Sequence, residues 1–419
     1  MSRRALTPLE IPYVLTGTVS SGSFTVRGPV DAGRLARAYA GLRREHPVLA
    51  GRIEAHAFGF DLVAPDAAPD EGAAPIQVEL RPFAPGDVRL GIDAERAIAA
   101  VQLVSDGDLH RVTLGVSHAV ADGAHALYLN LRLWELYSGA EPAQPAGLPA
   151  APTELADRLA DGLPASEPPA ASVVEVVPTA AVPSAADVDA GDFAFDRIRL
   201  DPTATEALRR RAKEAGLSLH GLLAGIIVAA ERAELDRPAD EAVPLAVFSP
   251  VDLRARAEPA VPAAAVTNFA GSSTVPVAVR GDTTPEEIGR IVLERLRADL
   301  ADGTVAAALA GAAPVTVTGG VPVRLSNIGA IPAPSTPAGV AALDFHTSSE
   351  VDIERVRALV RHAPPEALAP LVGLHHHALT FDGRLSIELR HAPGTLASDA
   401  ARRIRDRITA GLVGAEAAA

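Results

Sequence analysis

The chain has 419 residues, with 38 Lys and Arg against 52 Asp and Glu, a formal charge of −14, and no cysteine. The missing thiols exclude disulfides, thiolate metal sites and a covalent cysteine mechanism. The acidic balance argues against a nucleic-acid partner, because such a protein needs a basic surface that neutralises phosphates. The first residues carry no apolar run, and the longest apolar stretch, 219–230, is too short for a membrane span. We therefore expect a soluble, cytoplasmic protein.

The first half of the chain alternates strands and helices. We predict a strand over 23–30, a helix over 32–45 that Asp31 caps and Pro47 ends, and a strand over 48–54. A proline-rich loop over 64–86 precedes a hairpin with arms 96–104 and 109–117, turned at Asp106-Gly107, and a helix follows over 124–137. These elements predict a mixed α/β lobe over residues 1–138.

Residues 139–190 are dense in Pro, Ala, Ser and acidic residues, with a short helix candidate at 154–163, so we predict a crossover linker there. A second lobe over 191–419 follows. Its predicted helices are 204–215, 219–233, a helix from the capping box at Thr284 to about 299, and 398–412. Its predicted strands are 193–200, 245–249, 272–279, 315–318, 323–326, 373–381 and 384–391. The fold class is α/β (α+β), in two lobes.

One short stretch has the composition of a catalytic site. Ser117 to Gly123 reads S-H-A-V-A-D-G, which places His118 at the end of a predicted strand and Asp122-Gly123 just before a helix. A neutral histidine there can take a proton from a hydroxyl or amine near pH 7. Asp122 can stabilise the turn by pairing with a buried arginine. The local pattern alone is equally compatible with a structural histidine and an ordinary Asp-Gly turn.

The same stretch resembles the H-H-x-x-x-D-G motif of the condensation-domain and CoA-dependent acyltransferase superfamily. Further segments match in the same order: LARAYAGLRREHPVLAGRI, AGLSLHGLLAGIIVAA, SPVDLRARAEP, TNFAG and RLSNIGAI. The last two, with the stand-alone length, are most similar to the polyketide-associated acyltransferases (phthiocerol/phthiodiolone dimycocerosyl transferase-like), which esterify diols in mycobacterial lipid synthesis. The resemblance covers about residues 10–412.

The resemblance implies two chloramphenicol-acetyltransferase-like lobes with a tunnel between them, entered by the thioester donor and the acceptor from opposite faces. It implies that His118 is the general base and that Asp122, beside Gly123, is structural and arginine-paired. Arg254 is the candidate partner, ahead of Arg256 and Arg324.

The sequence departs from the motif at the first histidine, which is Ser117 here. Because side chains alternate along a strand, we expect this change to alter packing and to leave activity in place. Ser326 and Asn327 lie in RLSNIGAI, where they could donate to an oxyanion or shape the turn before Gly329; we favour the shaping role.

Other candidate sites are weaker. His375, His376 and His377 are consecutive on a predicted strand, so no more than two can converge, and we predict no metal site. No phosphate-binding glycine loop is present. We predict no permanently bound cofactor; an acyl-CoA or a phosphopantetheinyl carrier thioester serves as co-substrate.

The predicted function is acyl transfer from a CoA or carrier-protein thioester to a hydroxyl, with ester formation in lipid or polyketide natural-product biosynthesis. Two alternatives stay open. One is an amide-forming or cyclising condensation-like enzyme, and the other is a catalytically silent protein that binds a carrier or product. The predicted partners are a small alcohol or amine acceptor and an acyl carrier protein, with no nucleic acid, no membrane span and a monomeric state.

Overall fold

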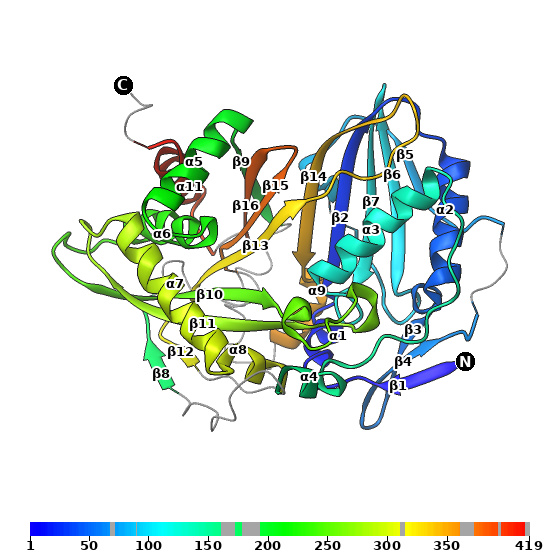
Figure 1. The fold of residues 1–419 in the computed structure, drawn as a ribbon, viewed down its shortest axis with the longest axis horizontal. Helices are drawn as coiled ribbons and strands as arrows, with labels where there is room; N and C mark the ends of the chain where they lie inside the picture. The colour runs from blue at the N-terminus through cyan, green and yellow to red at the C-terminus, as the bar shows by residue number, and fades with distance from the viewer. Residues whose placement is uncertain are drawn as a thin grey trace. The chain divides into compact units, whose positions relative to one another are not determined.

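The computed structural model describes residues 1–67, 72–88, 90–160, 172–177, 193–310, 315–360, 373–392 and 395–414. These residues form two compact units, each assembled from separate stretches of the chain (Figure 1). Unit 1 comprises residues 1–159, 252–270 and 331–356, and unit 2 comprises 160–251, 271–330 and 357–419. The loop at 252–270 and the stretch at 331–356 therefore pack with the N-terminal residues.

Unit 1 contains two sheets. A five-stranded sheet has the order β14-β2-β7-β6-β5, and a three-stranded antiparallel sheet has the order β1-β4-β3. The strands are β1 (Ser2–Ala5), β2 (Val19–Arg27), β3 (Arg52–His56), β4 (Gly59–Ala64), β5 (Gln77–Leu80), β6 (Ala99–Asp106), β7 (Leu109–Ser117) and β14 (Ala341–Glu350). The larger sheet is antiparallel except where β5 pairs parallel with β6.

Helices cover the five-stranded sheet, with α3 packed on β2 and β7 and α2 packed on α3 (Figure 1). Asp31 caps α2 by accepting a hydrogen bond from the Arg34 N–H, and Leu35, Tyr39 and Leu42 bury its inner face. The helices of unit 1 are α1 (Ile11–Leu15), α2 (Ala32–Glu45) and α3 (Gly123–Tyr137), with short turns η1 (Pro47–Ala50), η2 (Pro85–Val88), η3 (Pro152–Glu154), η5 (Arg254–Arg256) and η6 (Ala263–Ala265). At the unit boundaries lie α4 (Asp157–Ala160) and α9 (Ile353–Val360).

Unit 2 is built on a six-stranded sheet of order β11-β10-β13-β15-β16-β9, beside a two-stranded parallel pair β12-β8. The strands are β8 (Ser172–Glu175), β9 (Ala194–Arg199), β10 (Val243–Asp252), β11 (Ala270–Val279), β12 (Val315–Thr318), β13 (Val323–Ile331), β15 (His375–Phe381) and β16 (Arg384–His391). The helices are α5 (Pro202–Glu214), α6 (Leu219–Arg232), α7 (Pro285–Ala301), α8 (Thr304–Ala307) and α11 (Ser398–Val413), with the turn η7 (Ala308–Ala310).

Helix α6 lies at the centre of the unit 2 core, where it packs against α5, α7 and α11. Its approach to α7 depends on glycine. A Cβ on Gly225 would lie 1.9 Å from the Pro285 carbonyl oxygen, and one on Gly289 would lie 2.4 Å from the Gly221 carbonyl oxygen. The two helices therefore pack backbone against backbone, which explains the glycines inside them.

Most predicted elements are confirmed within one to four residues, and the helix at 32–45 has its predicted bounds. The predicted strand over 48–54 is wrong in its first half, because Pro47 starts a 3₁₀ turn and only Arg52 onward pairs with β4. Within the predicted loop 64–86, residues 77–80 form the edge strand β5. Of the predicted helix at 154–163, residues 161–163 lie outside the described part. The lobe bounds 1–138 and 191–419, with the linker 139–190, stay a prediction.

No single helix in the described ranges is long and apolar enough to cross a membrane; α5 and α6 meet those criteria only together, as a pair bent by 97°.

Candidate active site

His118 directly follows the last residue of β7, and its backbone is held from two sides. Its N–H donates to the Thr18 carbonyl at 2.8 Å, and its carbonyl accepts from Asn268 Nδ2 at 2.9 Å. The residue as a whole is partly exposed, while its Nδ1 atom is buried and has no hydrogen-bond partner in normal geometry among the described residues. The imidazole is thus oriented by a fixed backbone, with one nitrogen turned inward.

The ring of Tyr13 stacks on the His118 imidazole. The ring centroids are 4.0 Å apart and the planes differ by 12°. Tyr13 belongs to α1, a single turn of helix with Pro12 near its start. The stack covers one face of the imidazole and restricts its rotation. Nothing local in the sequence marks Tyr13 for this place, and sequence reasoning missed it.

Burial lowers the pKa of His118 below its ordinary value of 6.5. Three smaller effects oppose burial: the backbone carbonyl of His118 itself, the negative charge of Asp122, and Asn268. Because burial prevails, the imidazole is neutral at pH 7. A neutral imidazole is the form that accepts a proton.

Asp122 caps α3 and accepts hydrogen bonds through both carboxylate oxygens. The Oδ1 atom accepts from the His125 N–H at 3.0 Å, and Oδ2 accepts from the Phe269 N–H at 2.8 Å and from Arg254 Nη1 at 2.8 Å. Its own N–H donates to the Thr267 carbonyl at 3.1 Å. Burial alone would raise the pKa of Asp122, but the Arg254 charge and these hydrogen bonds outweigh burial and lower it.

Arg254, at the start of η5, forms a buried ion pair with Asp122. Both side chains are 6% exposed, and the same Nη1 atom lies 3.0 Å from Asp252, which is 49% exposed. The structure thus brings His118, Asp122 and Arg254 together in unit 1. The arginine that pairs with Asp122 in this unit is Arg254.

Gly123 is the first residue of α3. Its φ lies outside the left-handed region, and nothing lies within 4 Å of the position that a Cβ would take. Neither backbone conformation nor packing therefore requires glycine there. Ser117 is buried, and its N–H donates to the Ile98 carbonyl at 2.8 Å. That this serine alters packing and leaves activity in place stays a prediction.

A second hydrogen-bond network, centred on Glu10, connects the N-terminal segment to the loop at 267–269, which holds His118 and Asp122. Glu10, fully buried, accepts from Arg4 Nη2 at 2.6 Å, from the Thr7 N–H at 2.8 Å and from Thr267 Oγ1 at 2.5 Å. Thr267 and Asn268 lie in TNFAG, one of the segments that carry the family resemblance. The network fixes both α1, which carries Tyr13, and the loop that holds His118 and Asp122.

Ser326 and Asn327 lie in β13 of unit 2. Ser326 Oγ is 3.2 Å from His375 Nε2, and Asn327 Oδ1 accepts from the Gly329 N–H at 3.1 Å. Gly329 has a φ of 84° inside a strand. Asn327 therefore stabilises an irregular backbone that favours glycine.

His375 and His377 share one face of β15, with ring centroids 4.2 Å apart, while His376 Nδ1 lies 3.2 Å from the Arg324 carbonyl. Burial lowers the pKa of His376 to about 4 and that of His377 to about 3, so both are neutral at pH 7. In the part of the chain that is described, no three His, Asp or Glu side chains gather as metal ligands would.

Solved structures share this fold over nearly the whole chain. Polyketide synthase associated protein 5 from Mycobacterium tuberculosis superposes with a TM-score of 0.71 and 21% identity, covering 98% of both chains. The first condensation domain of the CDA synthetase superposes with a TM-score of 0.63 and 16% identity, covering 99% of this chain and 97% of that one. The chain thus has the condensation-domain acyltransferase fold predicted from its motifs.

Comparison of sequences identifies transferases among the proteins that this chain resembles. Residues 189–390 match the family described as phthiocerol/phthiodiolone dimycocerosyl transferase C-terminus. The phthiocerol/phthiodiolone dimycocerosyl transferase of Mycobacterium sp. (strain JLS) is 28% identical over 377 residues, covering 84% of this chain and 88% of its own. That of Mycobacterium tuberculosis (strain H37Rv) is 26% identical over 324 residues, covering 72% and 74%. These relatives are named transferases, and the predicted acyltransferase class is confirmed.

Proposed function

We propose that this acyltransferase moves an acyl group from a CoA or carrier-protein thioester to a hydroxyl, with His118 as general base. The acceptor O–H loses its proton to the imidazole as its oxygen attacks the thioester carbonyl. The tetrahedral intermediate then collapses, the C–S bond breaks, and the departing thiolate takes the proton back from the imidazolium. Ester and free thiol are the products, and the histidine returns to its neutral form.

The observation that carries this proposal is the state of His118: neutral at pH 7, partly exposed, and fixed by its backbone and by Tyr13. Its buried nitrogen is Nδ1, which leaves Nε2 to meet the acceptor. A base positioned in this way contributes about 10²–10⁴ in rate.

The carboxylate of Asp122 is engaged by Arg254 and by two backbone N–H groups, which supports a structural role. It stabilises the start of α3 and the loop that carries His118. We assign Arg254 to the same support, and Asn327 to shaping its strand, with Ser326 beside it. Gly123 begins α3, where neither backbone conformation nor packing requires glycine. The oxyanion role of these last two residues remains the alternative.

The complete lack of cysteine supports direct transfer, because no acyl-cysteine intermediate can form. The only sulfur in the reaction then belongs to the donor. No permanent cofactor is required by this chemistry. The dimycocerosyl transferase relatives favour an alcohol of lipid or polyketide origin as acceptor and an ester as product.

The test is mass spectrometry of the purified protein incubated with a panel of acyl-CoA and acyl-carrier thioesters and pooled alcohols and amines. We expect the parent protein to form an ester, and the amount of ester formed by His118→Ala in the same time to be at least a hundredfold lower. An amide or a cyclised product would contradict ester formation and indicate a condensation-type enzyme instead. No product with any donor and acceptor would favour the silent protein.

A further inference from the structure

Glu10 is a buried carboxylate to which the proposed chemistry assigns no part. Its side chain is 0% exposed, and both carboxylate oxygens accept hydrogen bonds. Arg4 donates to them as a bidentate pair, with Nη2 2.6 Å from Oε1 and Nη1 3.0 Å from Oε2. Thr267 Oγ1 lies 2.5 Å from Oε1, and Thr7 donates to Oε2 through its N–H at 2.8 Å and its hydroxyl at 3.0 Å. A carboxylate bound in this way has a fixed position.

The first connection from Glu10 to His118 runs along the chain through α1. Glu10 directly precedes this helix, and its carbonyl accepts from the Tyr13 N–H at 3.2 Å. The Tyr13 ring stacks on the His118 imidazole, and the Tyr13 carbonyl accepts from the Thr18 N–H at 2.9 Å. The Thr18 carbonyl in turn accepts from the His118 N–H at 2.8 Å. This segment therefore contacts His118 twice, at its ring and at its backbone.

The second connection runs through Thr267 and Asn268. Thr267, whose hydroxyl donates to Glu10, accepts from the Asp122 N–H at 3.1 Å through its carbonyl. Asn268 Nδ2 donates to the His118 carbonyl at 2.9 Å. Both connections lie inside unit 1. Glu10 therefore joins the segment that holds the N–H of His118 to the loop that holds its carbonyl.

We propose that Glu10 is a positioning residue for acyl transfer: its carboxylate fixes the distance between α1 and Thr267 and so aims the His118 imidazole at the acceptor hydroxyl. The proposal rests on the proposed function. In this role Glu10 acts through the contacts of Tyr13 and Thr267 and not on the substrate. A displacement of about 1 Å in a catalytic site lowers the rate about a hundredfold, so a small shift of the base is measurable.

The first variant is Glu10→Gln, which keeps the size of the side chain but replaces one acceptor oxygen by an amide group that only donates. Because Arg4, Thr7 and Thr267 all donate, the amide loses hydrogen bonds on one side of the connection. We expect kcat with a thioester donor to fall at least tenfold. The KM should change less than threefold, since Glu10 does not contact the substrates.

A second variant, Thr267→Val, breaks the same connection from the loop without leaving a buried charge unpaired. It removes the hydroxyl that donates to Glu10 and should lower kcat at least threefold. Thr267→Ser keeps the hydroxyl, and we expect it to recover the parent kcat within twofold.

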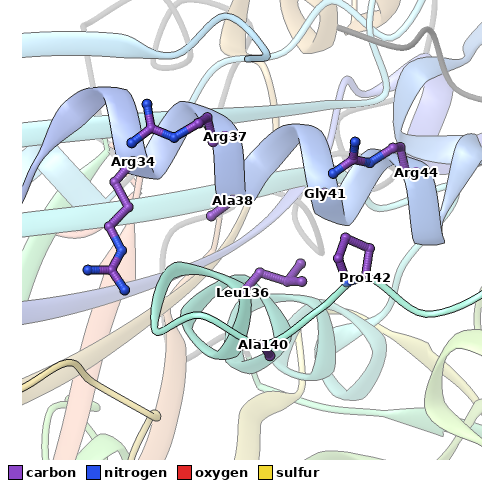
Figure 2. A pocket seen from close by; sticks show the side chains of 8 residues that line it. All are labelled: Arg34, Arg37, Ala38, Gly41, Arg44, Leu136, Ala140 and Pro142. Atoms are coloured by element: carbon purple, nitrogen blue, oxygen red, sulfur yellow. The ribbon is translucent and has the colours of Figure 1, made fainter. Parts of the chain in front are cut away.

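The matched control is Glu45→Gln, the same substitution at a second buried carboxylate of unit 1. Glu45 is 2% exposed, pairs with Arg132 at 2.6 Å and accepts from the Ala143 N–H at 2.7 Å. Pro142, which precedes Ala143, lines a groove of about 270 Å³ along α2 (Figure 2). A general loosening of unit 1 would lower kcat in both variants, whereas a positioning role lowers it in Glu10→Gln alone. We expect Glu45→Gln to keep kcat within threefold of the parent.

Nuclear magnetic resonance of protein with isotopically labelled histidine reports the position of the His118 ring without any substrate. The His118 ring signals are identified by their loss in His118→Ala. The Tyr13 ring, stacked at 4.0 Å, shifts these signals upfield. We expect Glu10→Gln to move them toward the position that they take in Tyr13→Ala, and Glu45→Gln to leave them in place.

A folded Glu10→Gln with the parent kcat, or with unmoved His118 signals, would overturn the proposal, and so would equal losses of kcat in Glu10→Gln and Glu45→Gln. If Glu10→Gln does not fold, Thr267→Val decides by the same two measurements. Absence of acyl transfer in the parent would refute the proposed function, while the His118 signals would still show whether Glu10 positions the ring.

Discussion

The Asp122–Arg254 ion pair should matter more for stability than for chemistry, and Asp122→Asn tests this. The substitution keeps the shape and the capping oxygen but removes the charge. Among the described residues, Asp252 is then the one carboxylate within 4.0 Å of the buried Arg254 guanidinium. Breaking one partner of a buried pair costs about 3–5 kcal/mol. Because Asp252 still compensates part of the charge, we expect a loss of about 3 kcal/mol, a large share of the roughly 5–15 kcal/mol that stabilises a domain.

Urea unfolding followed by circular dichroism measures this loss, and a double-mutant cycle isolates the pair. Asp122→Asn/Arg254→Met removes both charges, so we expect it to be less destabilised than the sum of the two single variants by about 1–3 kcal/mol. Activity, expressed per folded molecule, should stay within tenfold of the parent in Asp122→Asn. A variant that unfolds within about 0.5 kcal/mol of the parent but has lost its activity would refute the structural role.

Three further predictions concern the surroundings of the base and the buried histidines. Tyr13→Phe should keep kcat within threefold because the stack survives, whereas Tyr13→Ala should lower it at least tenfold; equal rates in the two variants would show that the stack has no part in orienting His118. Gly123→Ala should change the free energy of unfolding by less than about 1 kcal/mol, since nothing lies within 4 Å of the added Cβ; a larger loss, by urea unfolding, would contradict this. Stability should fall as the pH drops from about 6.5 to 4. In that range the two histidines bind protons in the unfolded chain but stay neutral in the folded chain, where the pKa of His377 is about 3 and that of His376 about 4. His377→Phe should make that fall shallower by about 1.4 kcal/mol per pH unit, and an unchanged slope would contradict the buried neutral state.

Local signals predicted the long helices α2, α3, α5, α6, α7 and α11, and missed the shorter α1, α8 and α9. The bounds of α2 follow from a capping Asp31, an apolar periodicity and Pro47, all of which lie within the helix or beside it. The capping box of Thr284 and Glu287 likewise marks the start of α7, where both reciprocal hydrogen bonds are present. These elements could be predicted because their determinants are neighbours in sequence.

Long-range pairing could not be predicted. Strand β14 was missed because it is rich in polar residues and pairs with β2, more than 300 residues away; Phe345 opposite Phe24 is one pair of that register. Strand β5 was missed because it is a short edge strand beside β6 within a proline-rich stretch. Neither strand carries a local pattern strong enough to indicate its partner.

The same distinction applies to the site. The motif around His118 and Asp122 is contiguous, so its chemistry could be inferred from a few residues. Tyr13 and Asn268 meet that motif only through tertiary contacts. Glu10 is linked to it only by way of Thr267, whose carbonyl accepts from the Asp122 N–H. The segment TNFAG carries part of the family resemblance, but nothing local explains why its threonine should bind a glutamate near the N-terminus or its asparagine a backbone carbonyl.

The central claim is that His118 is the general base, and the most direct measurement is the pre-steady-state rate of acyl transfer from a purified thioester donor. We predict a rate at least a hundredfold lower in His118→Ala than in the parent, with unchanged folding by circular dichroism. In the parent, we predict a rate that falls only below pH 6.5, since burial lowers the pKa of His118. Transfer by His118→Ala within a few-fold of the parent would contradict the claim.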